Sequence, residues 1–103
     1  MSRNRADSWI PVSFRTALDL PQLWGRLAYL SPSDAELVSH FHLPEGAELA
    51  LDFELGGALF PAVRARIAEA AHDREGYHNY RLVILDREQS SLLRAAIAKA
   101  LPR

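Results

Sequence analysis

The chain has 103 residues, 49% of them hydrophobic, which predicts one folded domain with enough apolar material for a core. Its 12 basic and 13 acidic residues leave a net charge of −1. This balance argues against a binder of DNA or RNA backbones, which needs a basic surface. The sequence contains no cysteine, which excludes disulfides, thiolate zinc sites and cysteine nucleophiles.

The polar first segment, residues 1–8, lacks the apolar run of a signal peptide. The longest nearly uncharged stretch, Leu55–Val63, is far shorter than the ~20 residues that span a bilayer. We therefore expect a cytoplasmic protein without membrane insertion. We also expect residues 1–8 to form a flexible N-terminal arm and residues 9–103 to form a single domain.

The first half of the expected domain contains three segments that favour strands. Alternating apolar residues predict a strand over Val12–Leu18, and Trp24–Leu30 predicts a second strand, with Trp24 filling the core. The segment Ser31–Phe41 leaves two interpretations open. Its serine, proline and acid resemble a helix start, whereas Ala35–Ser39 equally forms a short strand, which we favour.

The clearest strand is Glu48–Leu55, where leucine and phenylalanine alternate with acidic residues and alanine, after a turn at Leu43–Gly46. Two glycines end it, and Ala62–Ala68 follows as its hairpin partner. This pairing predicts that two acids of the first strand face two arginines of the second, namely Asp52 and Glu54 against Arg64 and Arg66.

A polar loop over Asp73–Asn79 leads to a last strand, Tyr80–Leu85, and then to a helix. Asp86 and Gln89 have the spacing of a capping box. The helix needs cover from the mouth or outer face of the sheet, because six apolar residues recur at helical spacing: Leu92, Leu93, Ala96, Ile97, Ala100 and Leu101. Six short strands between turns suggest a small barrel or sandwich.

This order of elements resembles that of PilZ domains. The similarity runs through nearly the whole chain, at Gly25–Ser31, Pro44–Gly46, Glu48–Leu55, Val63–Ile67, Gly76–Leu82 and the helix from Asp86. The resemblance implies a mainly β fold, a six-stranded antiparallel barrel with a C-terminal α-helix. It also implies a link to the bacterial second messenger cyclic di-GMP, for which many members are receptors.

The ligand motifs of that family are altered in this sequence. In the motif Arg-x-x-x-Arg before the first strand, Arg5 is kept and Trp9 replaces the second arginine. In the motif Asp/Asn-x-Ser-x-x-Gly, only Ser31 is kept, because Tyr29 replaces the acid or amide and Asp34 replaces the glycine.

These replacements weaken the chemistry that a cyclic dinucleotide needs. A tryptophan stacks on a base but does not neutralise a phosphate, and Asp34 adds a negative charge. Each lost charge-assisted hydrogen bond costs about 1.5–3 kcal/mol, or one to two decades of affinity. We therefore expect weak or no cyclic di-GMP binding and no other cofactor.

Two uses of the basic N-terminal residues stay open. Arg3 and Arg5 are either solvated charges of the arm or, together with Ser31, part of a rearranged cyclic di-GMP site to which Arg15 or Arg26 contributes. The second interpretation is the alternative function, a true receptor.

The leading hypothesis is an adaptor that acts by protein–protein contact. Ligand-free members of the resembled family bind partners in bacterial signalling or in the type IV pilus machinery, which implies motility or pilus control here. Trp9 and Phe41 lie beside polar or loop segments and are the candidate interface. An oligonucleotide-binding barrel is disfavoured by the acidic side of Glu48–Leu55.

No sequence pattern indicates catalysis or metal binding. No nucleophile elbow, phosphate loop or metal-hydrolase motif occurs, so we do not expect an enzyme. His40 and His42 share one side of an extended strand, yet with His72 or His78 they complete no usual metal spacing. We expect no metal.

Overall fold

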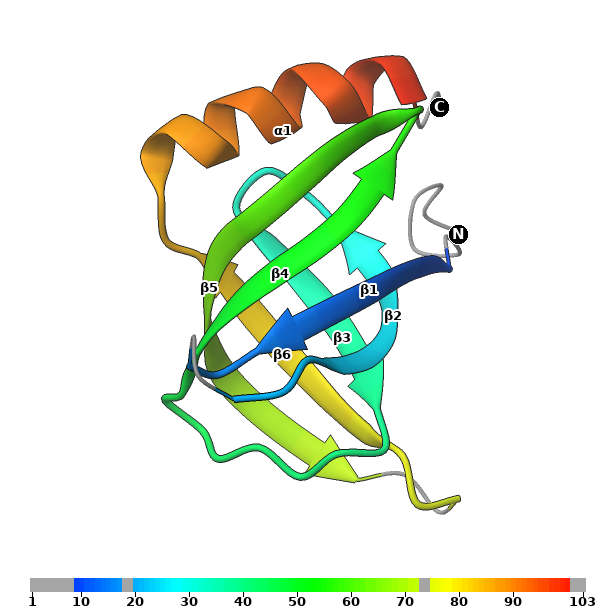
Figure 1. The fold of residues 1–103 in the computed structure, drawn as a ribbon, viewed down its shortest axis with the longest axis vertical. Coiled ribbons are helices and arrows are strands. Elements are labelled where there is room, and N and C mark those ends of the chain that lie inside the picture. The colour runs from blue at the N-terminus through cyan, green and yellow to red at the C-terminus, as the bar shows by residue number, and fades with distance from the viewer. Residues whose placement is uncertain (1–8, 18–19, 73–74, 101–103) are drawn as a thin grey trace.

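The computed structural model describes residues 9–17, 20–72 and 75–100. Six antiparallel strands close into a barrel in the order β1–β2–β3–β6–β5–β4, and one helix lies across an end of it (Figure 1). The fold class expected from the sequence is therefore confirmed. The elements are β1 Ile10–Arg15, β2 Leu23–Leu30, β3 Asp34–Ser39, β4 Glu48–Leu55, β5 Ala58–His72, β6 His78–Ile84 and α1 Arg87–Ala100.

The strand interpretation of Ser31–Phe41 is confirmed, because β3 occupies its middle. Several predicted ends were wrong. β1 stops at Arg15 instead of reaching Leu18, which lies outside the described residues. β5 is longer than Ala62–Ala68 at both ends, and β6 begins within the expected loop. An antiparallel strand with one solvated face can contain many polar residues. The polar first residues of β6 were therefore mistaken for loop, and the polar last residues of β5 were missed.

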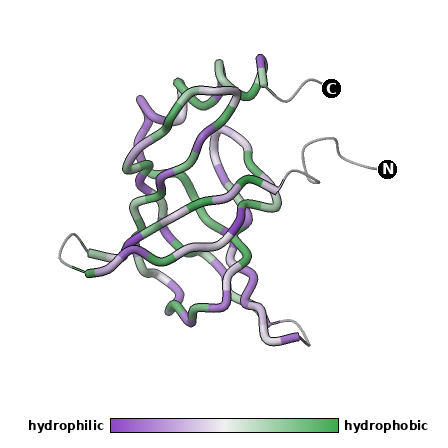
Figure 2. Tube along the Cα trace, turned by 45° about the vertical axis from the view of Figure 1, so that its right-hand side comes forward, coloured by the Kyte–Doolittle hydropathy of each residue, from purple (hydrophilic) through white to green (hydrophobic). Residues whose placement is uncertain are grey.

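The barrel core is formed by the side chains that point inward from alternate positions of each strand. Leu49, Leu51, Phe53 and Leu55 of β4 are all buried, as their alternation predicted. Phe60 of β5 is partly buried against the core and stacks on Phe53 with ring centres 5.6 Å apart. Hydrophobic positions accordingly alternate with hydrophilic ones along the strands (Figure 2).

A bulge in β5 sets the register of the β4–β5 hairpin. Gly56 and Gly57 have φ values of 62° and 85° and form a two-residue turn, so β5 begins at once with Ala58. Ala62 is then an extra residue with a φ of 52°. Its N–H donates to the carboxylate of Asp52 at 2.7 Å, which gives the bulged backbone an acceptor.

The predicted pairing of Asp52 and Glu54 with Arg64 and Arg66 was wrong, because the two-residue turn places Ala58 opposite Leu55 and so brings both acids to the start of β5, before either arginine. The bulge then shifts every later position of β5 by only one. The register instead places Glu48 opposite Arg66, Ala50 opposite Arg64 and Glu54 opposite Leu59. The ion pair that forms joins Arg64 to Glu48 at 3.5 Å and is exposed, so it contributes little.

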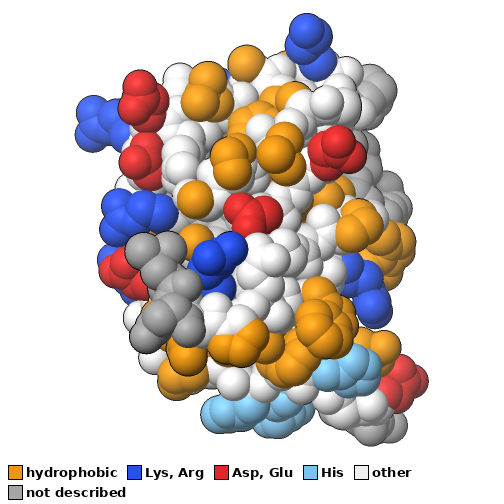
Figure 3. Space-filling view, in the orientation of Figure 1, with side chains coloured by type: hydrophobic (Ala, Val, Ile, Leu, Met, Phe, Trp, Pro, Cys, Tyr) orange, Lys and Arg blue, Asp and Glu red, His pale blue; other side chains and the backbone are white. Residues whose placement is uncertain are grey.

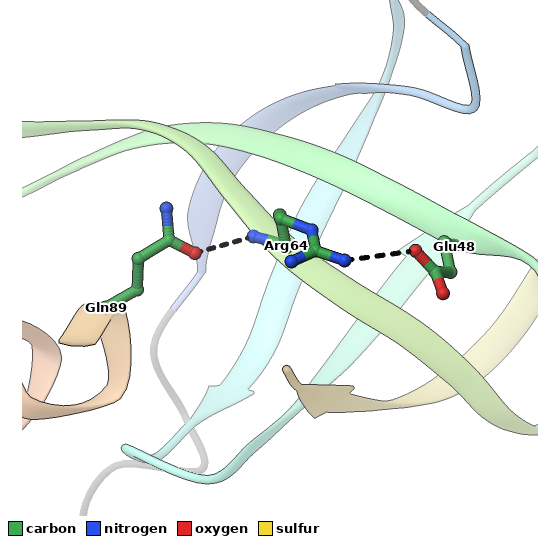
Figure 4. Close-up of polar contacts among 3 residues, drawn as sticks. All are labelled: Glu48, Arg64 and Gln89. Atoms are coloured by element: carbon green, nitrogen blue, oxygen red, sulfur yellow. Dashed lines mark hydrogen bonds and ion pairs between the residues drawn. The ribbon is translucent and has the colours of Figure 1, made fainter. Parts of the chain in front are cut away.

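The first turn of α1 is fixed to the barrel by two side chains. Asp86 caps the helix as predicted, since its carboxylate accepts the Gln89 N–H at 2.9 Å. The Gln89 side chain reaches β5 instead of completing a capping box. Its Oε1 accepts the N–H of Arg64 at 2.9 Å (Figure 4). Its Nε2 donates to the carbonyl of Ala62 at 3.0 Å. Ser90 Oγ donates to the carbonyl of Pro32 at 2.7 Å.

The buried face of α1 is narrower than predicted. Leu93 is fully buried in the barrel core, and Ala96, Ile97 and Ala100 pack partly against it. Leu92 is 59% exposed, so its assignment to the apolar face was wrong. It lies about 100° around the helix from Leu93, the fully buried residue of α1. No helix of the described residues is long and apolar enough to cross a membrane.

Candidate functional site

The altered arginine motif is represented in the structure by Trp9. Arg3 and Arg5 lie outside the described residues. Trp9 directly precedes β1 and is 58% exposed. The guanidinium carbon of Arg26 lies over its ring, 4.4 Å from the centre. Arg26 is thus next to the position where the motif has an arginine, whereas Arg15 lies at the opposite end of β1.

The altered second motif forms the turn between β2 and β3. Ser31 Oγ accepts the N–H groups of Ser33 at 3.2 Å and of Asp34 at 3.0 Å, and the N–H of Ser31 donates to the carbonyl of Asp34 at 2.8 Å. The Ser31 hydroxyl also lies within hydrogen-bond distance of the Asp34 carboxylate. Ser31, which matches the motif, and Asp34, which replaces its glycine, therefore bond to each other.

Neighbouring elements hold this turn in place. The Ser33 carbonyl accepts the N–H of Ile84 at 2.9 Å, and Ser90 of α1 bonds to Pro32. Tyr29, at the position of the motif's acid or amide, lies opposite Glu36 in the β2–β3 ladder. The turn is consequently a braced structural connection that brings a half-buried carboxylate to the place of a glycine.

Trp9 and the turn lie at the same end of the β1–β2 ladder without forming one pocket. Ile10 is opposite Leu27, so Trp9 lies about three residues, or ~10 Å, along β2 from Ser31. The Trp9 ring contacts Arg26, which is five positions before Ser31 on β2. Within the described part of the chain, the cleft that Trp9 lines includes neither Ser31 nor Asp34.

That cleft has a volume of about 390 Å³, and four of its nine described lining residues carry aromatic rings. The Arg26 guanidinium lies over Tyr77 as well, 5.1 Å from its ring centre, and Tyr77 contacts the ring of His40 at 4.1 Å. Figure 3 shows hydrophobic side chains beside a basic and a histidine side chain on this face of the barrel. We call it the Trp9–Trp24 cleft, defined by Trp9, Trp24, Arg26, His40 and Tyr77.

Trp24 belongs to the surface and not to the core, so its predicted core role was wrong. It is 65% exposed and meets Phe41 edge-to-face, with ring centres 5.1 Å apart. Phe41 is partly exposed and packs partly against the core. The signal that sequence reasoning missed is parity: Trp24 and Arg26 are two apart on one strand and therefore share a face.

Two local features fix the position of Phe41 beside Trp24. A side chain at Gly25 would lie 2.5 Å from the Val38 carbonyl oxygen, so glycine allows the end of β3 to approach β2 closely. Ser39 Oγ then donates to the carbonyl of Trp24 at 2.9 Å.

Tyr80 fixes the segment after β3 through hydrogen bonds from the barrel core. Its buried hydroxyl donates to the Phe41 carbonyl at 2.7 Å and accepts the Leu43 N–H at 2.8 Å. Burial raises the pKa of Tyr80, and the bond from Leu43 opposes that rise. A buried polar contact therefore fixes the Phe41 segment next to the cleft, in addition to strand pairing.

The histidines gather near the end of the β5–β6 hairpin. The rings of His72 and His78 are 4.3 Å apart, and those of His42 and His78 are 5.5 Å apart. Among residues 9–17, 20–72 and 75–100, no group of three histidine or carboxylate side chains is placed to hold a metal ion.

Comparisons with known proteins identify the fold. No family profile and no curated protein sequence matches the chain. Among solved structures, it superimposes on YcgR from Escherichia coli, solved in complex with cyclic di-GMP, with a TM-score of 0.67, 17% identity and 85% of this chain covered. It matches the Bacillus subtilis inhibitor of motility MotI (DgrA) with a TM-score of 0.67, 16% identity and 94% coverage.

A third match is the PilZ domain of CeSA from a cellulose-synthesizing bacterium, with a TM-score of 0.62, 21% identity and 89% of this chain covered. The chain spans 39% of YcgR and 49% of MotI, but 93% of the CeSA domain. Its architecture is accordingly that of a PilZ domain, which confirms the resemblance at the level of fold.

Proposed function

We propose that this chain, a PilZ-like domain in fold, is a non-enzymatic signalling adaptor that works by protein–protein contact and binds cyclic di-GMP weakly or not at all. The setting we infer is cyclic di-GMP-linked motility or pilus control. Its support is structural likeness to a protein solved with cyclic di-GMP and to an inhibitor of motility. The partner is a protein of bacterial signalling or of the pilus machinery.

The observation that carries this proposal is the chemistry at the two motif positions. Trp9 offers a ring where an arginine would offer two hydrogen bonds and a positive charge. Asp34 places a carboxylate, bonded to Ser31, where a glycine would let a dianionic ligand approach. Losing one charge-assisted bond costs about 1.5–3 kcal/mol, so two such losses move a micromolar ligand towards millimolar affinity.

Isothermal titration of the whole chain with cyclic di-GMP tests the proposal. We expect a dissociation constant on the order of millimolar or no measurable heat. Arg5→Ala should then change nothing, with the exposed arginine variant Arg66→Ala as its control. Micromolar binding that Arg5→Ala abolishes would overturn the adaptor account.

The second candidate is a true cyclic di-GMP receptor that uses Arg3, Arg5 and Ser31. The contact between Arg26 and Trp9 favours it, because it supplies a guanidinium beside the altered motif position. This function requires micromolar binding that weakens in both Arg5→Ala and Arg26→Gln. An affinity that neither substitution changes would reject it.

A further inference from the structure

Among the described residues, the Trp9–Trp24 cleft combines the positive charge of Arg26 with four aromatic side chains. Its described lining contains Arg26 and no aspartate or glutamate. Trp9 and Trp24 are both more than half exposed, although both are large apolar side chains. Tryptophan, tyrosine and arginine are the residue types most enriched at the centres of protein interfaces.

We propose that the Trp9–Trp24 cleft docks an acidic segment of a protein partner, with a carboxylate bound to Arg26 and an adjacent apolar side chain packed on Trp24 and Phe41. This inference rests on the proposed function in that it requires a protein partner. It adds the site and the chemistry of that partner.

Arg26 has the contacts and the charge to bind a carboxylate. A guanidinium that lies over aromatic rings presents its N–H donors at its edge, and the rings of Trp9 and Tyr77 take up stacking contacts. Within the described residues, ion pairs join Arg64 to Glu48 and Arg81 to Glu69, and Arg26 takes part in neither. A carboxylate accepts two parallel bonds from this edge, and the surrounding rings strengthen them by excluding water.

The apolar surface beside the cleft, where Phe41 packs on Trp24, is held in place before a partner arrives. Phe41 is fixed against Trp24 by the bonds of Tyr80 and by the close approach at Gly25. Because Trp24 and Phe41 are already fixed, a partner side chain that packs on them restricts few further side chains. The entropic cost of binding is therefore low. Leucine, isoleucine or an aromatic residue beside the carboxylate fits such a surface.

Because the barrel is closed, we expect a partner to bind this surface through side-chain contacts and not by adding a β-strand. The strands β1, β2 and β3, which carry most of the cleft lining, each pair with a neighbouring strand on both sides, so they leave little open edge for an added β-strand. A partner segment of any backbone conformation is acceptable if it presents the carboxylate and the apolar side chain together. Specificity then comes from charge and from the rings of the cleft.

Selection of random peptides displayed on phage against the intact chain tests this inference. We expect enriched peptides to carry aspartate or glutamate next to an apolar residue. Synthetic copies should lose at least about tenfold in affinity, measured by fluorescence anisotropy, towards Arg26→Gln and towards Trp24→Ala. Two exposed residues outside the cleft give matched controls, Arg66→Gln and Leu59→Ala, which should bind as the native chain does.

Several results would overturn the inference. Peptides without a carboxylate, peptides that bind Arg26→Gln equally well, or no enrichment at all each contradict it. Peptides that instead lose binding to Leu92→Ala or Leu59→Ala would move the interface to the α1 side and leave the adaptor function standing. Tight cyclic di-GMP binding in the separate titration would end the adaptor function even if acidic peptides occupy the cleft.

Discussion

Removing the hydroxyl of Tyr80 tests how the surface around Phe41 is held. Tyr80→Phe keeps the ring, which is buried in the core, and deletes one oxygen. That oxygen accepts the Leu43 N–H at 2.8 Å and donates to the Phe41 carbonyl at 2.7 Å. The substitution therefore leaves two backbone groups without their partner and creates almost no cavity.

The expected loss of stability follows from these two bonds. Each hydrogen bond contributes about 1 kcal/mol net, and a buried N–H left without an acceptor adds a desolvation penalty. We expect Tyr80→Phe to lower the free energy of unfolding by about 2–3 kcal/mol. This is a large fraction of the about 5–15 kcal/mol typical of a domain. Urea unfolding followed by tryptophan fluorescence measures this difference in unfolding free energy. The slope of free energy against urea concentration should be the same for both chains.

The same residue predicts an alkaline transition. Because burial raises the pKa of Tyr80, the folded chain holds this proton more tightly than the unfolded chain does. Its contribution is fully present below the ordinary tyrosine pKa of about 10 and is lost as pH rises through the folded pKa. Tyr80→Phe should remove this part of the alkaline loss.

Two results would refute the reasoning about Tyr80. A change in unfolding free energy below about 0.5 kcal/mol would show that the hydroxyl bonds are not needed to hold the Phe41 segment. An alkaline stability curve that is the same in Tyr80→Phe and in the native chain would show that its folded pKa is not raised.

Three further substitutions test the fold, each by urea unfolding. Leu93→Ala should cost about 2–5 kcal/mol and the matched Leu92→Ala less than about 1 kcal/mol, because only Leu93 is buried; equal costs would contradict the helix placement. Gln89→Ala should cost about 1–2 kcal/mol and its exposed neighbour Glu88→Ala almost nothing, because Gln89 bonds twice to β5. Gly25→Ala should cost about 1–3 kcal/mol, and a neutral outcome would reject the close approach of β3.

The strand and helix types followed from hydrophobic periodicity, but the pairing of β4 with β5 did not. Alternation identifies which side chains of Glu48–Leu55 point inward. The register across the hairpin depends on a two-residue turn and on one bulged alanine, Ala62, whose positive φ no propensity predicts. The Asp52 carboxylate stabilises that bulge, so the acid expected to pair with arginine serves the backbone instead.

The candidate site was partly accessible from the sequence. The altered motifs could be read residue by residue, and the structure shows Ser31 and Asp34 in one turn. The contact of Arg26 with Trp9 and Tyr77 joins the start of β1, the middle of β2 and the segment before β6. Such a contact depends on barrel closure, which a linear pattern does not encode. Arg3 and Arg5 lie outside the described residues, so their role stays a prediction.

Restoring the motifs measures the central claim most directly. The variant Trp9→Arg, Tyr29→Asp, Asp34→Gly returns the arginine, the acid and the glycine, and its folding is checked by thermal unfolding. If these replacements are what weakens cyclic di-GMP binding, calorimetry should show an affinity at least about tenfold higher for the restored chain than for the native chain. A native chain that binds cyclic di-GMP as tightly as the restored one would contradict the account.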